Sequence, residues 1–159
     1  MRRIAILVAD GIDGKALAIH AGLVAAQAVP RFVGPRLGAV QTGQGGPIEV
    51  DVTMEAMPAV LFDALVVPDG SQGVAELKKL GHAIEFVKEQ YRHCKPILAL
   101  GAGKSLLEAA GVKPTLPSGD PDGGLLYLEG ADMDDILPRF IEAIAAHRHL
   151  EREMDPPPV

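Results

Sequence analysis

Aromatic residues and cysteine are scarce in this chain of 159 residues, which has no Trp, two Tyr, four Phe and one Cys. Haem pockets and base-stacking platforms usually draw on more aromatic side chains than this, so the chain itself is a poor candidate for either. A single cysteine, Cys94, cannot form an internal disulfide. This is typical of proteins from a reducing compartment, and we expect a cytoplasmic location.

A net positive charge and long apolar runs are also missing. The formal net charge is -6, whereas a nucleic-acid binder needs a basic face to displace counterions. No run approaches the roughly 18 apolar residues that a membrane span needs. The apolar run over residues 4–9 is too short for a secretory signal, since Asp10 and Gly11 interrupt it. We therefore expect neither nucleic acid nor a membrane as a partner.

The composition that remains is globular, with 48% hydrophobic and 23% charged residues. The length suits one domain. We expect that domain over residues 1–154, followed by a loose proline-rich tail over 155–159.

Short apolar runs alternate with segments of helical periodicity. We expect strands over residues 3–9, 31–34, 63–68, 97–100 and 125–128. Runs in which apolar and polar residues do not alternate are typical of strands buried on both faces of a parallel sheet. We expect helices over 13–29, 74–80, 82–93, 104–110 and 135–153. Residues 36–52 indicate a hairpin-like excursion and residues 114–124 a mobile loop. This order predicts an α/β fold, a three-layer αβα sandwich with a doubly wound, mostly parallel sheet.

Two helices carry further signals. In the first, apolar residues recur at helical spacing: Leu17, Ala21, Val24 and Ala28. Asp13 is expected to cap this helix and Pro30 to stop it. In the last helix, Pro138 should lie in the first turn.

Ligands of such folds bind at the carboxyl ends of the strands. The predicted pocket residues follow three strands, and they are Asp10, Gly11, Asp69, Gly70, Ser71, Gly101 and Lys104. No metal site is expected. His147 and His149 would face different directions on a helix, and the acidic cluster Asp132, Asp134 and Asp135 is interpreted as capping of a helix start.

The segment 101–105, Gly-Ala-Gly-Lys-Ser, resembles the end of a phosphate-binding loop. The first glycine of that pattern would fall at Leu98, inside a predicted strand, which favours a tight strand-to-helix turn instead. Many α/β enzymes place a nucleophile on the crest of such a turn. Here the crest is Gly101 followed by Ala102, and neither has an attacking atom. Other candidate nucleophiles lie away from the crest: Cys94, Ser71 and Ser105.

Five segments together resemble the C-terminal domain of large-subunit haem catalases, over nearly the whole chain. They are residues 4–13, 35–38, 63–70, 95–97 and 145–148. The pieces Pro-Arg-Leu-Gly over 35–38 and Ala-Ala-His-Arg over 145–148 are particularly characteristic. The same fold occurs in the class I glutamine amidotransferase-like superfamily, which includes intracellular proteases, glyoxalases and deglycases.

The resemblance implies a flavodoxin-like domain that follows a catalytic region holding haem, its proximal tyrosine and its distal histidine. Neither Tyr91 nor Tyr127 has the arginine four residues earlier that accompanies a haem-ligating tyrosine. We expect no cofactor in this chain, and haem in the parent protein. The implied partners are the catalase core, the sister subunits of a tetramer and, for a chaperone-like role, unfolded client proteins.

The enzymes of the superfamily carry Cys at the crest and Glu in the first helix. Here these positions are Gly101 and a site near Ala16, and neither Asp10 nor Asp13 has the spacing to replace the Glu. A remnant of an oxyanion hole is expected around Gly70. We predict a non-catalytic domain that contributes stability, oligomer packing or chaperone-like activity. Two alternatives stay open: an enzyme of the glyoxalase, deglycase or amidase type, and a ligand-binding module.

Overall fold

The predicted apolar runs pair side by side as parallel strands. In the computed structural model, which describes residues 1–130 and 132–159, one sheet has six strands in the order β5-β2-β1-β6-β7-β8. Every neighbouring pair in this sheet is parallel. The strands are β1 (Arg3–Leu7), β2 (Val29–Gly34), β5 (Val52–Thr53), β6 (Ala64–Val67), β7 (Ile97–Leu100) and β8 (Leu125–Leu128). The order reverses beside β1, which makes the sheet doubly wound as predicted.

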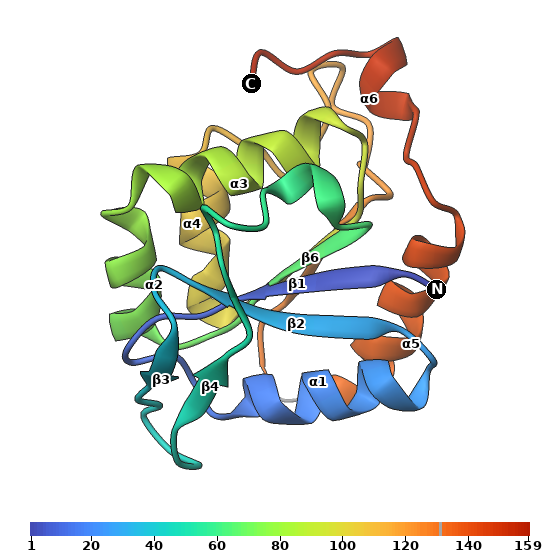
Figure 1. Cartoon of the computed structure of the whole chain (residues 1–159). Helices are drawn as coiled ribbons and strands as arrows, with labels where there is room; N and C mark the ends of the chain where they lie inside the picture. The colour runs from blue at the N-terminus through green and yellow to red at the C-terminus, as the bar shows by residue number, and fades with distance from the viewer. Residues whose placement is uncertain (131) are drawn as a thin grey trace.

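Helices cover both faces of this sheet and complete the three layers (Figure 1). On one face α1 (Lys15–Ala25) packs against α5 (Met133–Ala145). On the other face α2 (Ser71–Lys78), α3 (Gly81–Arg92) and α4 (Lys104–Ala109) pack against one another. The central strands are shielded from water on both sides, so all four residues of β6 are fully buried. This burial explains why they are continuously apolar.

Shorter elements connect these layers. The predicted excursion is an antiparallel hairpin of β3 (Gly38–Val40) and β4 (Ile48–Val50). Single turns of 3-10 helix occur at η1 (Ala59–Leu61) and η2 (Gly101–Gly103), and a short α6 (Glu151–Met154) lies near the C-terminus. Among the described residues, none of the helices combines the length and the hydrophobicity required to cross a lipid bilayer.

The first helix differs from the sequence prediction at both ends. Its N-cap position is Gly14, and Asp13 Oδ1 instead accepts a hydrogen bond from the Lys15 N–H at 2.8 Å. The helix ends well before Pro30, which already belongs to β2, because Gln27 adopts a left-handed φ of 63°. A proline was therefore not needed to stop this helix.

The structure shows which side of α1 packs on the sheet. Leu17 and Val24, two of the residues whose spacing predicted the helix, are 39% and 52% exposed. The face that packs on the sheet is instead formed by Ala16, Ile19 and Leu23. Because α1 carries apolar residues on its outer side as well, its periodicity does not distinguish the inner face from the outer face.

The predicted terminal helix is broken in two. It is interrupted between α5 and α6, where His147 has a left-handed φ of 71°. Pro138 lies in the second turn of α5 and not in the first, because this helix begins at Met133. Asp132 does cap the helix, since its side chain accepts a hydrogen bond from the Asp135 N–H.

A buried ion pair ties the C-terminal segment to the domain. Arg152 Nε and Asp122 Oδ2 lie 2.7 Å apart, and their side chains are 2% and 0% exposed. The same guanidinium donates hydrogen bonds to the carbonyl oxygens of Tyr91 and Lys95 at 3.2 and 2.8 Å. It also stacks over the Tyr91 ring, 4.4 Å from the centroid. One side chain thus joins α6, the end of α3 and the loop before β8.

The tail beyond α6 makes a few contacts with this region. Asp155 Oδ2 accepts a hydrogen bond from the Ser118 N–H at 3.0 Å, and the Val159 carbonyl oxygen accepts one from Arg92 Nε at 3.0 Å. The looseness of residues 155–159 and the mobility of the loop over 114–124 stay predictions.

The buried ion pair predicts a large stability defect in the Arg152→Ala variant. Removing the guanidinium leaves the Asp122 carboxylate buried and unpaired, so the free energy of unfolding should fall by about 3–5 kcal/mol in urea denaturation. The control Arg139→Ala, at an exposed position of α5, should stay within about 0.5 kcal/mol of wild type. An Arg152→Ala variant as stable as this control would contradict the assignment.

Tyr91 predicts a loss of stability at alkaline pH. Burial, helped by the nearby Asp122 carboxylate, raises the pKa of Tyr91 from 10.0 to about 12. The stabilisation from this group is therefore fully present below pH 10 and is lost as the pH rises toward 12. The Tyr91→Phe variant should lose less stability than wild type between pH 9 and pH 11, by roughly 1 kcal/mol. Tyr127 and Lys95, whose pKa values are also shifted, remain in both proteins, so parallel pH curves would refute this expectation.

Candidate functional site

The loops that follow β1, β6 and β7 meet at the carboxyl edge of the sheet. The Asp13 N–H donates a hydrogen bond to the Asp69 carbonyl oxygen at 2.9 Å, which joins the first loop to the second. Gly70 lies where these backbones approach most closely. Its φ is 113°, and a Cβ atom added to it would lie only 2.6 Å from the Asp13 nitrogen. A side chain at Gly70 would force the two loops apart.

The crest of the turn after β7 is Gly101, the first residue of η2, with a left-handed φ of 50°. A Cβ atom added here would collide with the carboxylate of Asp69. Glycine suits this position for two reasons. Residues with a side chain disfavour the left-handed backbone conformation, and the Asp69 carboxylate occupies the space where a Cβ atom would lie. The crest of the turn lacks a nucleophile, and the space beside it is filled.

Asp69 itself makes the decisive contacts. Its Oδ1 accepts a hydrogen bond from the Gly70 N–H at 2.7 Å and another from the Ala102 N–H at 2.8 Å. Two backbone N–H groups that converge on one oxygen are the arrangement that stabilises an oxyanion in acyl-transfer enzymes. The Gly70 and Ala102 N–H groups thus bind one oxygen, which the protein itself supplies. That they are the remnant of an oxyanion hole stays a prediction.

The other predicted pocket residues are divided between different surroundings. Gly11 and Gly70 line an open groove of about 670 Å³, together with residues of the α1 N-terminus and the β3–β4 hairpin. Asp10 Oδ1 accepts a hydrogen bond from the Gln41 N–H at 2.8 Å and thereby holds the hairpin. Ser71 is exposed at the start of α2. Lys104 Nζ lies 3.8 Å from Glu129 Oε1 and 5.4 Å from the Tyr127 ring centroid, beside β8.

The alternative nucleophiles are poorly placed for chemistry. Ser105 Oγ donates a hydrogen bond to the Ala102 carbonyl oxygen at 2.9 Å. Cys94 precedes β7, at the opposite end of this strand from Gly101, and is only 1% exposed. Burial raises the pKa of the Cys94 thiol, which keeps it in the unreactive protonated form at neutral pH. Ala16, near the expected carboxylate position, is buried in α1.

Metal ligands do not gather in the part of the chain that the structure describes, where no three His, Cys, Asp or Glu side chains could share an ion. His147 and His149 were predicted on a helix, but both lie in the connection between α5 and α6. His149 Nε2 is 3.1 Å from the Ala143 carbonyl oxygen, and His147 Nδ1 is 3.3 Å from Arg2 Nη1. These contacts tie the connection to its neighbours.

Comparison with known sequences identifies the family. A family model for the C-terminal domain found in long catalases matches residues 1–154. The chain belongs to this family. Catalase HPII of Mycobacterium avium is 37% identical over 166 aligned residues, which cover 99% of this chain and 23% of that protein. Catalase HPII of Pseudomonas putida is 35% identical, with 96% of this chain and 20% of that protein covered. The chain therefore spans about a fifth of the length of these catalases.

Solved structures with this fold come from the DJ-1/ThiJ/PfpI group. A ThiJ/PfpI domain protein of Brachyspira murdochii superposes with a TM-score of 0.76 at 16% identity, over 91% of this chain and 96% of that chain. A DJ-1 superfamily protein of Agrobacterium tumefaciens gives a TM-score of 0.73 at 19% identity, over 91% of this chain and 90% of that chain. These likenesses confirm the flavodoxin-like, class I glutamine amidotransferase-like fold.

The contact between Gly101 and Asp69 can be tested with a double-mutant cycle. The Gly101→Ala substitution should destabilise wild type more than it destabilises the Asp69→Gly variant, with a coupling of at least about 1 kcal/mol in urea denaturation. The strain of the left-handed φ, about 1 kcal/mol, remains in both backgrounds and cancels.

Gly81→Ala is the matched control for this cycle, because no atom lies within 4 Å of the added Cβ position. It should cost the same in both backgrounds. Additive effects of Gly101→Ala and Asp69→Gly would show that the carboxylate does not occupy the space beside the crest.

Proposed function

We propose that this chain is the non-catalytic C-terminal domain of a haem catalase and that its contribution is packing, through contacts with the catalase region and its sister subunits. The family membership supports the parent protein, whose hydrogen peroxide chemistry would belong to the region preceding this domain. One observation supports the non-catalytic role: the Asp69 carboxylate accepts hydrogen bonds from the Gly70 and Ala102 N–H groups. An enzyme of this fold would need those donors for a substrate oxygen.

Electrostatics strengthens this argument. An oxyanion forming beside Gly101 would compete for the two N–H groups with a carboxylate oxygen that already holds both at 2.7 and 2.8 Å. Charge-assisted hydrogen bonds of this kind are about twice as strong as neutral ones. A second negative charge at the same place would be repelled at short range. The site therefore disfavours both the nucleophile and the intermediate of acyl-transfer chemistry.

Haem does not suit the residues of this domain. An iron-ligating tyrosine must present its oxygen to an open pocket, but Tyr91 is 2% exposed and lies beneath the Arg152 guanidinium. The pKa of Tyr127 is raised to about 12 by burial and by nearby Asp122, which opposes the phenolate form that would bind iron. Haem, its proximal tyrosine and its distal histidine are thus proposed for the parent's catalytic region only.

Two functions compete with this proposal. A glyoxalase, deglycase or amidase would have to recruit Cys94, Ser71 or Ser105, and none of these is at the crest. A ligand-binding module could use the groove beside Gly11 and Gly70, which Asp13 and Lys15 also line. The Asp13 carboxylate there already accepts the Lys15 N–H at 2.8 Å, so the structure favours no particular ligand. Chaperone-like action on unfolded clients is an extension of the same packing role, and no described contact favours it over packing.

The purified chain should be inert in three assays. Added haemin should give no Soret band shift, hydrogen peroxide should not be consumed, and methylglyoxal and glutamine anilides should be turned over no faster by wild type than by Cys94→Ala. Ser105→Ala serves as a second control for a hydroxyl nucleophile. Turnover that either substitution abolishes would refute the non-catalytic role, and a Soret shift would refute the assignment of haem to the parent region.

A further inference from the structure

Helix α1 carries an outer face that is unusual for a surface helix. From residue 16 to residue 29 the sequence contains no charged residue. The outer face is exposed, and it is formed by Leu17, Ala18, Ala21, Val24 and Ala25. A helix that is apolar on both its inner and its outer face is normally buried on both. Apart from Lys15 at its first position and the half-buried His20, α1 carries no charged or titratable side chain that would suit this face to water.

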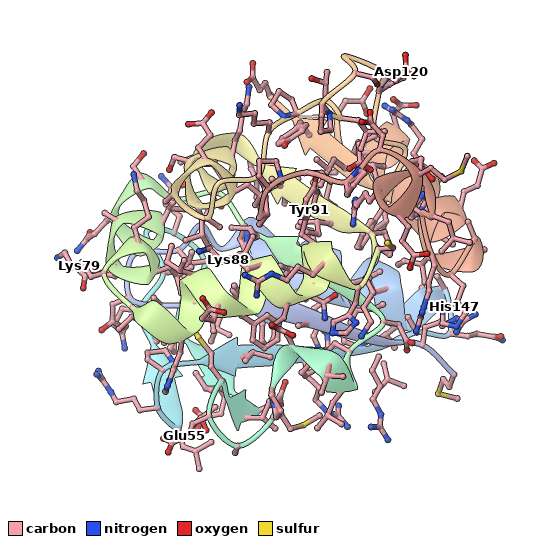
Figure 2. The ribbon with its side chains drawn as sticks, turned by 90° about the horizontal axis from the view of Figure 1, so that it is seen from above. Glu55, Lys79, Lys88, Tyr91, Asp120 and His147 are labelled. Atoms are coloured by element: carbon pink, nitrogen blue, oxygen red, sulfur yellow. The ribbon has the colours of Figure 1, made fainter. Side chains whose placement is uncertain are left out.

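Helix α3 provides the comparison within the same molecule. Its outward positions carry polar or charged side chains, and they are His82, Glu85, Lys88, Glu89 and Arg92. Figure 2 shows Lys88 among such side chains, with Lys79 at the periphery before α3 begins. Two helices of similar length thus lie on opposite faces of one sheet, and the outer surface of α1 is apolar whereas that of α3 is polar and charged. The face on α3 suits solvent, whereas the face on α1 suits a protein partner.

The apolar surface continues from α1 onto α5. A groove of about 190 Å³ follows the end of α1 and is lined by Arg2, Ala26, Gln27, Ala28, Ile141, Ile144 and Ala145. Figure 1 places the N-terminus beside α5, at the same edge. The first residues thus lie at the rim of this surface, and Arg2 forms part of the groove. We call the outer residues of α1 and this groove together the α1 docking face.

The family relationship indicates what covers this face. The match is to the C-terminal domain of long catalases, and it accounts for 23% and 20% of two of them. In those catalases most of the chain precedes the matched C-terminal part, so the preceding region is connected to the domain at the edge where residue 1 lies here. A region tethered at the rim of an apolar surface has a high effective concentration there, which favours docking on that surface over more distant ones.

We propose that the α1 docking face packs against the catalase region that precedes this domain in long catalases. This inference rests on the proposed function and specifies which face of the domain performs it. The opposite face, with α3 and its charged side chains, remains in water.

The test uses the accessibility of single cysteines. The one natural cysteine, Cys94, is 1% exposed, so an engineered thiol on the surface reacts separately from it. The Val24→Cys variant places a thiol on the α1 docking face, and the Ala75→Cys variant places one on exposed α2. Each is prepared as the isolated chain and as a chimera in which the chain replaces the matched part of Mycobacterium avium catalase HPII. Maleimide labelling rates are read by mass spectrometry of the relevant peptide.

In the Val24→Cys variant, labelling should be at least about tenfold slower in the chimera than in the isolated chain. In the Ala75→Cys variant the two rates should agree within about twofold. Adding Ala21→Glu to the Val24→Cys chimera should restore fast labelling, because a charge at the centre of the face opposes its burial. The Ala75→Glu substitution is the matched control and should leave the labelling of Val24→Cys slow.

Three results would overturn the inference. Equal labelling of Val24→Cys in chimera and isolated chain would show that the face stays in water. Slow labelling of Ala75→Cys alone would place the contact on the opposite side of the domain, while leaving the packing role intact. Slow labelling of Val24→Cys in the isolated chain at high concentration only would assign the face to a second copy. Enzymatic turnover by the isolated chain bears on the proposed function and not on this face.

Discussion

The site depends on a single carboxylate oxygen that accepts two backbone hydrogen bonds. Asp69 Oδ1 joins the turn after β6 to the turn after β7 through the Gly70 and Ala102 N–H groups. The same carboxylate takes the volume in which a side chain at position 101 would begin. The glycine at the crest and the two converging N–H groups therefore meet at one carboxylate, which ties the two turns together.

A second set of polar contacts ties the domain together at the other end of β7. The Arg152–Asp122 pair joins the C-terminal segment to the end of α3 and to the loop before β8. Both ends of the sheet are thus tied by hydrogen-bonded charged groups, the half-buried Asp69 at one end and the buried Arg152–Asp122 pair at the other. A buried pair stabilises the domain only while both partners are present. The apolar outer face of α1, next to the N-terminus, is the part of the domain's surface suited to another protein.

The sequence predicted the architecture well because buried parallel strands have a strong signal. The runs that became β1, β6 and β7 are continuously apolar and end in glycine-containing turns, and these turns meet at the carboxyl edge of the sheet. The signal failed where several backbone choices were compatible with one composition. Helix α1 has apolar residues on both sides, so its sequence does not show which side faces the sheet. The helix break at His147 depends on a left-handed φ, and the residue type histidine does not predict this conformation. The role of Asp69 was also missed, because it arises from residues more than thirty positions apart that meet only across neighbouring strands.

Residue-resolved hydrogen exchange of the Gly70 and Ala102 amides tests the central claim most directly. If one carboxylate oxygen holds both N–H groups, NMR should find both amides protected in wild type. Both should lose that protection together in the Asp69→Gly variant, while the amides within α4 keep theirs. Exchange at Gly70 and Ala102 that is unaffected by removal of the carboxylate would contradict the account.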